Sequence, residues 1–235
     1  QNSLPSKSPF GGIIEYNGTI GQELIDDATY NQLIINNPAG VTLPSEASIT
    51  VTQLAIKSGA LLEVGTGRSM TATTIVNEAG AGGLWIRAAE GQPNGSLIFQ
   101  NTVENPVSAT VEMYSKAFKS ETPVAGTYYK WQYFGIPMRE LVSASPTFDG
   151  SFVRRYNPGG KIDIGGGVYR SKWEPLTNDS SLRPFEGYEI TQNSPRTISF
   201  QGVLENRDYL RDANDPLIYY PEAAFPGQYI FANPY

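Results

Sequence analysis

The first half of the chain contains an internal repeat, and this repeat limits the possible folds more than any other feature. Residues 33–43 (LIINNPAGVTL), 54–64 (LAIKSGALLEV) and 75–85 (IVNEAGAGGLW) align without a gap at a spacing of 21 residues. Apolar residues share the first and last columns, whereas small or turn-forming residues share the middle columns. Within each unit, apolar and polar residues alternate with a period of two, which indicates a strand, a turn and a second strand rather than a helix.

A repeat of this length has an inward face that is too small to form a core alone. Stacking the units at the ~4.8 Å spacing of neighbouring strands would bury a continuous apolar column. We therefore predict an all-β fold that begins with a short right-handed β-solenoid, in coils of about 21 residues. Leucine-rich repeats have a similar length, but their Leu-rich consensus and Asn turn do not recur here.

The stacking makes predictions about individual side chains, because residues 21 apart should lie one above the other. Lys57 should lie over Glu78 at the solvent face, as a structural ion pair rather than a catalytic base. Asn77 interrupts the apolar column of Ile35 and Ile56, which predicts either a ladder of Asn side chains or a local shift in register.

The ends of the repeat are less regular than its centre. Beyond residue 88 the spacing loosens, and apolar residues between 97 and 113 indicate one or two further coils that end near Tyr114. At the other end, residues 8–30 are expected to cover the open strand edges, so that deletion of residues 1–28 should cause aggregation.

The composition changes near residue 115 and indicates two domains. Residues 1–115 carry 4 basic and 10 acidic side chains, whereas residues 116–235 carry 13 of each. Six of the 27 aromatic residues lie in the first part and 21 in the second. We expect residues 1–115 to form the β-solenoid with an N-terminal cap, and residues 116–235 to form a second module.

The second module is expected to be an antiparallel β-sandwich or jelly-roll-like domain. Short aromatic and β-branched runs, separated by clusters of Pro, Gly, Asn and Asp, are typical of strands and turns. The predicted strands are residues 128–134, 151–156, 167–173, 186–190 and 196–203. One short helix is predicted near residues 138–142, and Gly165, Gly166 and Gly167 are expected to form a hairpin turn rather than a phosphate-binding loop.

The composition also excludes several classes of function. The chain contains no His and no Cys, which removes Ser–His and Cys–His nucleophiles, disulfides and nearly every zinc, copper or haem site. A net charge of −6 disfavours binding to nucleic acid. No apolar run of ~18 residues is present, so we predict no membrane insertion.

Enzymatic activity on polysaccharides is the remaining catalytic alternative, because a β-helix can carry a polysaccharide lyase or a glycoside hydrolase. The candidates are the adjacent carboxylates Asp26 and Asp27, together with Lys57. Adjacent Asp residues are ordinarily turn formers, and the acidic first half offers few cations to hold a uronate. We therefore assign no catalytic residue.

Calcium is the one metal that the composition permits, because it takes oxygen ligands. The densest oxygen cluster lacks the order of an EF-hand and includes Arg207 and Arg211, so local salt links or turn caps are favoured. We predict no cofactor and keep calcium as the alternative, with the candidate ligands Glu205, Asp208, Asp212, Asn214 and Asp215.

Exposed aromatic rings could stack on sugars, which present apolar faces. The candidate glycan-stacking residues are Trp131, Trp173 and Tyr188. In a module with 21 aromatic residues most rings must be core, so a structural role is the competing interpretation for each.

The order of these segments resembles a segment of large surface proteins of the Bacteroidetes that are exported by the type IX secretion system. The resemblance covers about nine-tenths of the chain through structural motifs of low specificity. The motifs are EYNGTIGQELIDDATYNQLIINNPAGVTL (15–43), LAIKSGALLEVGTGRSMTA (54–72), GGLWIRAAEGQPNGSLIF (82–99), KWQYFGIPM (130–138), KWEPL (172–176), FEGYEI (185–190), ISFQGVLEN (198–206) and GQYIFANPY (227–235).

The resemblance implies a mature, secreted or cell-surface protein that lies outside the outer membrane. It carries no catalytic residue, and it implies that the natural chain continues beyond Tyr235 toward a C-terminal sorting domain. We therefore expect a non-catalytic structural or adhesin-type module that acts as a rigid spacer, with other cell-surface proteins or extracellular glycans as partners. A glycan-binding module is the alternative, and the oligomeric state stays open.

Overall fold

The computed structural model describes residues 9–26, 28–122, 126–142, 146–177, 180–207 and 217–232. Its regular elements are β-strands and two short 3-10 turns, Gly80–Gly83 and Pro146–Phe148. The chain divides into two compact units. The first comprises residues 1–114 and 197–206, and the second comprises residues 115–196 and 207–235.

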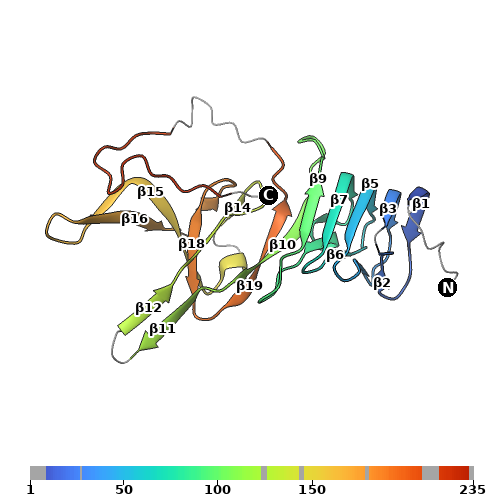
Figure 1. The fold of residues 1–235 in the computed structure, drawn as a ribbon, viewed down its shortest axis with the longest axis horizontal. Coiled ribbons are helices and arrows are strands. Elements are labelled where there is room, and N and C mark those ends of the chain that lie inside the picture. The colour runs from blue at the N-terminus through green and yellow to red at the C-terminus, as the bar shows by residue number, and fades with distance from the viewer. Residues whose placement is uncertain are drawn as a thin grey trace. The chain divides into compact units, whose positions relative to one another are not determined.

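The first unit is a β-solenoid of about five coils, as the repeat predicts. Each coil gives one strand to each of two sheets, and the strands of successive coils pair in parallel (Figure 1). The first sheet contains, in spatial order, β1 (Phe10–Tyr16), β3 (Thr29–Ile35), β5 (Ser48–Ile56), β7 (Ser69–Asn77) and β9 (Ser96–Phe99). The second contains β2 (Gln22–Glu23), β4 (Val41–Thr42), β6 (Leu62–Val64), β8 (Leu84–Ile86), β10 (Ser108–Ser115) and β19 (Arg196–Val203).

The core of this unit consists of the apolar columns that the repeat predicts. Leu33 lies opposite Leu54, and Leu54 lies opposite Ile75, at the spacing of 21 residues. All three side chains are buried. Burial of apolar surface contributes about 1.5–3 kcal/mol for each side chain of this kind, so a column that runs through several coils stabilises all of them together.

The predicted register is wrong by one residue in the fourth coil. Leu62 lies opposite Leu84, and Val64 opposite Ile86, so Ile86 takes the core column in which the ungapped repeat places Trp85. The physical reason is the turn Gly80–Gly83, which adds one residue between β7 and β8. Trp85 lies on the outer face instead, where its indole nitrogen donates a hydrogen bond to the carbonyl of Gly82 at 3.0 Å.

Asn77 follows neither of the two alternatives that the sequence leaves open. It stays opposite Ile56, so the register does not shift at this residue and no Asn ladder forms with the preceding coil. Its amide nitrogen donates to the carbonyls of Gly80 at 2.7 Å and Ser108 at 2.8 Å, and its side-chain oxygen accepts from the backbone of Ala79 at 3.0 Å. One polar side chain therefore links the end of β7 to the start of β10.

The first and fifth coils depart from the regular spacing. Part of the segment expected to cover the N-terminal end is itself a coil, because β1 and β2 pair in parallel with β3 and β4. A further coil after the repeat is confirmed by β9 and β10. Beyond β9, the side-chain amide of Asn101 accepts from the nitrogen of Ile75 at 2.8 Å and donates to its carbonyl at 2.7 Å, and so replaces a paired strand residue.

The second unit contains antiparallel sheets, as predicted. A four-stranded sheet has the spatial order β13 (Gln132–Phe134), β18 (Tyr188–Gln192), β15 (Ser151–Asp163) and β16 (Tyr169–Pro175). Two smaller sheets pair β11 (Phe118–Thr122) with β12 (Gly126–Lys130), and β14 (Leu141–Val142) with β17 (Ser181–Leu182).

The predicted helix near residues 138–142 is wrong. This segment leads into β14, where Leu141 lies opposite Leu182 in an antiparallel pair. Met138 and Leu141 are both buried, and cross-strand pairing satisfies the backbone of Leu141 while the side chain packs inward. A tertiary pairing thus overrides the weak local helix propensity.

The predicted hairpin turn at residues 165–167 is confirmed. It joins β15 to β16, and the backbone nitrogen of Ile164 donates to the carbonyl of Val168 at 3.1 Å. All three glycines have positive φ values, which other residues adopt only with strain.

Candidate functional site

The lysine considered as a catalytic base is part of a surface ion pair. Lys57 Nζ lies 2.8 Å from Glu78 Oε1, and both side chains are well exposed, as the stacking predicts. Asp26 is exposed, whereas Asp27 lies outside the described residues. The structure therefore gives Lys57 a carboxylate partner one coil away on the solenoid surface.

The calcium candidates are mostly outside the described part of the chain. Of that set only Glu205 is described; it is buried, and its Oε1 accepts from the backbone nitrogen of Asn206 at 3.1 Å. Asp208, Asp212, Asn214 and Asp215 lie outside the described residues. Among the residues that are described, no three His, Cys, Asp or Glu side chains gather in a way that could hold a metal ion.

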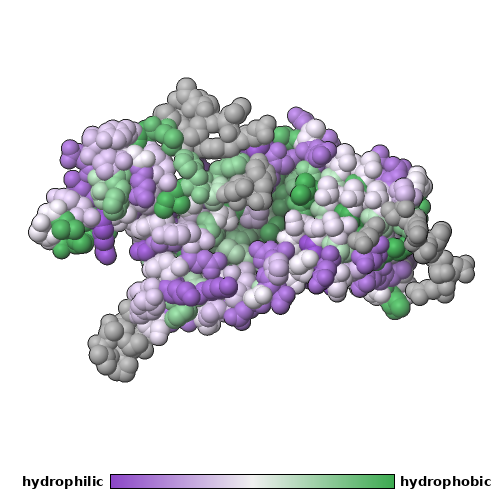
Figure 2. Space-filling view, viewed as in Figure 1, coloured by the Kyte–Doolittle hydropathy of each residue, from purple (hydrophilic) through white to green (hydrophobic). Residues whose placement is uncertain are grey.

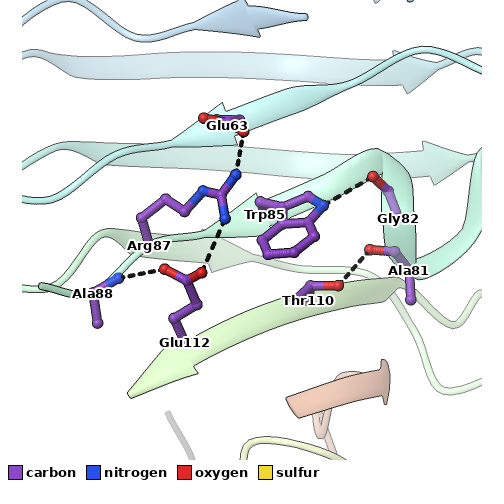
Figure 3. A network of polar contacts seen from close by, with 8 residues as sticks. All are labelled: Glu63, Ala81, Gly82, Trp85, Arg87, Ala88, Thr110 and Glu112. Atoms are coloured by element: carbon purple, nitrogen blue, oxygen red, sulfur yellow. Dashed lines mark hydrogen bonds and ion pairs between the residues drawn. The ribbon is translucent and has the colours of Figure 1, made fainter. Parts of the chain in front are cut away.

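A charged network lies on the outer face of the second solenoid sheet (Figure 3). The guanidinium of Arg87 pairs with Glu63 and with Glu112, the latter at 2.9 Å between Nη1 and Oε1. It also lies 3.9 Å from the ring centre of Trp85. The second carboxylate oxygen of Glu112 accepts from the backbone nitrogen of Ala88 at 3.1 Å.

This network joins three coils, because Glu63 belongs to β6, Arg87 follows β8 and Glu112 belongs to β10. Burial lowers the pKa of Arg87, but the hydrogen bonds with Glu63 and Glu112 outweigh it, and the pKa is raised overall. Arg87 therefore stays charged and cannot transfer a proton near neutral pH. Its arrangement favours a structural role, which holds neighbouring coils together.

The second unit carries a different kind of surface, a cluster of aromatic rings on one face of its four-stranded sheet. We call the set Tyr129, Trp131, Tyr133, Phe152 and Trp173 the aromatic platform. Trp131 and Tyr133 are two residues apart along the chain, so they share a face. The ring centres of Trp131 and Phe152 lie 5.8 Å apart, and those of Tyr133 and Trp173 lie 5.7 Å apart.

The two predicted tryptophans lie within this platform and are partly covered by neighbours. Tyr129 stacks on Trp131 at 6.0 Å, and the guanidinium of Arg154 lies 3.7 Å from the same ring centre. Tyr133 stacks on Trp173, and Tyr156 meets it edge-on at 5.4 Å. The exposed rings of the platform belong instead to Tyr133 (67%), Tyr129 (45%) and Phe152 (45%), which the sequence analysis did not single out.

The third predicted stacking residue, Tyr188, is a core residue and cannot offer a ring face to a sugar. It is 0% exposed, and its ring packs 5.7 Å from that of Phe134. Its hydroxyl donates to Glu186 and accepts from the backbone nitrogen of Arg183, both at 2.7 Å. Burial, and next the nearby charge of Glu186, raise the pKa of Tyr188.

A charge pair lies on the same face as the platform. Glu189 lies opposite Tyr133 on one side and Arg154 on the other, and the two charged side chains form an ion pair. Burial raises the pKa of Glu189, and the charge of Arg154 opposes that rise. Since the two charges neutralise each other, the platform is aromatic above and electrically balanced below.

A second exposed apolar feature is the tip of the β15–β16 hairpin. Figure 2 shows hydrophobic side chains gathered there, and Ile164, Val168 and Tyr169 are all exposed. The amine of Lys161 lies 4.6 Å from the ring centre of Tyr169. The tip is thus an apolar end with a cation beside it.

The fold of the first unit defines the class, an all-β protein built on a parallel β-solenoid. Within that class, the chain is similar to the minor fimbrium subunit Mfa5 of Porphyromonas gingivalis, a member of the Bacteroidetes. The two are 32% identical over 153 residues, which cover 61% of this chain and 12% of that protein. No family model and no solved structure matches the chain.

The described residues contain no helix that is long and apolar enough to cross a membrane.

Proposed function

We propose that this chain is a non-catalytic structural module of a secreted or cell-surface bacterial protein, in which it acts as a rigid spacer and a scaffold for interactions. The observation that carries the proposal is the stack of about five parallel coils with a continuous buried core. The similarity to a fimbrial subunit supports it. Because the chain spans 12% of that relative, the module would serve as one segment of a longer protein.

The rigidity follows from how the coils are joined. Each coil is paired along two sheets, so bending the stack would strain two hydrogen-bonded ladders and open the buried columns at once. Side chains on the outer face add links between coils, through Lys57 with Glu78 and through Arg87 with two glutamates. A spacer of this kind holds an attached binding surface at a fixed distance from its anchor.

The expected partners are other cell-surface proteins, and the expected place is the exterior of the outer membrane, with export by the type IX route as part of the proposal. A net charge of −6 makes nucleic acid an unfavourable partner.

Antibodies raised against this chain would test the surface role. We expect immunogold labelling of intact cells of the source bacterium, along surface structures. Labelling that appears only after the cells are permeabilised would contradict the proposal. An antibody against a cytoplasmic protein provides the matched control for cell integrity.

Enzymatic degradation of polysaccharides stays the catalytic alternative and has its own test. It requires turnover of an acidic polysaccharide that is lost on substitution of Asp26, Asp27 or Lys57. We expect no turnover above a buffer control in the unmodified chain. Turnover that disappears in Lys57→Met or Asp26→Asn would replace the structural proposal with an enzymatic one.

Glycan binding is the second candidate function. It is favoured by one specific observation, the aromatic platform of exposed and stacked rings on a rigid sheet. Such binding would give the scaffold an adhesive surface.

A further inference from the structure

We propose that the aromatic platform binds neutral oligosaccharides, with Tyr133 as the main stacking ring and the two tryptophans as its structural support. This inference rests on the second candidate function, glycan binding, and does not depend on the spacer role of the solenoid. It differs from the expectation drawn from the sequence, which gave the stacking role to Trp131 and Trp173.

The first step concerns which rings are available. Trp131 lies between the ring of Tyr129 and the guanidinium of Arg154, so both are contacts that a sugar would have to displace. Tyr133 stacks on Trp173 with an angle of 21° between the rings and is nevertheless 67% exposed. An exposure that large leaves the opposite face of the tyrosine ring open to solvent.

The second step concerns preorganisation. Trp173 is held by Tyr156 edge-on at 5.4 Å, and the backbone of Tyr133 is paired with Glu189 in the centre of the sheet. A tyrosine ring fixed in this way loses little conformational freedom when a ligand stacks on it. The ring is apolar on its face and carries a hydroxyl at its rim, which matches the C–H face and the hydroxyl rim of a pyranose.

The third step concerns charge and selects the ligand class. The cation that faces the platform, Arg154, is already paired with Glu189 and packed on Trp131. An acidic sugar such as a uronate would need a cation with unused hydrogen-bonding capacity, and recruiting Arg154 would leave the buried carboxylate of Glu189 uncompensated. A neutral sugar avoids this cost.

The test is a titration of the full chain with defined oligosaccharides, followed by calorimetry and by tryptophan fluorescence. The neutral probes are cellohexaose, xylohexaose and mannohexaose, and the acidic probes are a trigalacturonate and a hyaluronan hexasaccharide. We expect at least one neutral probe to bind and the acidic probes to bind at least tenfold more weakly.

The variants separate stacking from folding. Tyr133→Ala should weaken neutral-sugar binding about tenfold, whereas Tyr133→Phe keeps the ring and should stay within about threefold. Tyr128→Ala is the matched control, because Tyr128 is also an exposed tyrosine, at 58%, but contacts Phe118 instead of the platform. Thermal unfolding of each variant verifies that the fold is retained.

Each other outcome overturns the inference in a distinguishable way. Neutral-sugar binding that survives Tyr133→Ala would place the site elsewhere and leave glycan binding intact. A preference for the acidic probes would overturn the ligand class. Absence of binding by every probe at millimolar concentration would overturn glycan binding as well, and concentration-dependent dimerisation lost in Tyr133→Ala would assign the platform to a second copy of this chain.

Discussion

At the scale of the single residue, amide and guanidinium side chains complete the solenoid where its repeat is imperfect. Asn77 and Asn101 both donate and accept hydrogen bonds with backbone groups, as only an amide side chain can. Neither role could be predicted from the sequence, because each depends on a partner in a neighbouring coil. The Lys57–Glu78 pair could be predicted, because both residues lie in the regular part of the repeat.

Arg87 should contribute more to stability than Lys57, although both form ion pairs on the solenoid surface. Arg87 is hydrogen-bonded to two glutamates and is less exposed, so Arg87→Ala should lower the free energy of unfolding by about 1–3 kcal/mol. Lys57→Ala removes one exposed pair and should cost less than about 1 kcal/mol. Urea unfolding of both variants measures the difference.

Arg87→Lys provides the matched control, because it keeps the charge but cannot bridge both carboxylates with a planar group. Its stability should lie between those of the unmodified chain and Arg87→Ala. Equal losses in Arg87→Ala and Lys57→Ala would show that the network of Figure 3 adds nothing beyond an ordinary surface pair.

At the scale of the element, the regular coils were predictable and the irregular ones were not. A period of two within a period of 21 located β3 to β7, whereas the extra residue in the turn Gly80–Gly83 displaced Trp85 from its predicted column. The strand at residues 196–203 was predicted with its observed bounds, but its position beside β10 was not, because pairing between distant segments leaves no periodic signal.

The turn that precedes β9 makes a close approach that a side chain should disturb. A Cβ atom at Gly95 would lie 2.5 Å from the carbonyl oxygen of Val64 and 2.9 Å from that of Gly65. Gly95→Ala should therefore lower the free energy of unfolding by about 1–3 kcal/mol, because the backbone of the preceding coil would have to move.

Gly82→Ala is the matched control, since a Cβ atom there would meet nothing within 4 Å. It should change stability by no more than about 0.5 kcal/mol. Thermal unfolding followed by circular dichroism compares the two, and a Gly95→Ala variant as stable as the control would refute the close packing of these coils.

At the scale of the whole molecule, the first unit is discontinuous in sequence. The change in composition near residue 115 coincides with the point where the chain leaves the first unit, but nothing in the composition indicates that residues 197–206 return to it. Within this returning segment, Ile198, Phe200 and Leu204 are buried. The backbone nitrogen of Leu204 donates to the carbonyl of Val107 at 2.8 Å.

A chain truncated after residue 115 should therefore fold poorly, although the repeat itself is complete. Loss of β19 leaves the edge of β10 unpaired and removes three buried apolar side chains, so we expect oligomers or aggregates in size-exclusion chromatography with light scattering. Rejoining residues 197–206 through a flexible linker should restore a monomer. A truncated chain that is already monomeric and as stable as the rejoined one would exclude this role of β19.

The late return of β19 also gives the solenoid an order in time. A ribosome adds about 5–20 residues per second, so several seconds separate the synthesis of β10 from that of its partner strand. The same delay, at another rate, applies whenever the chain crosses a barrier with its N-terminus first. During that interval the first unit presents an adhesive strand edge, which makes a holding factor or a slow release of the chain advantageous until residue 206 has emerged.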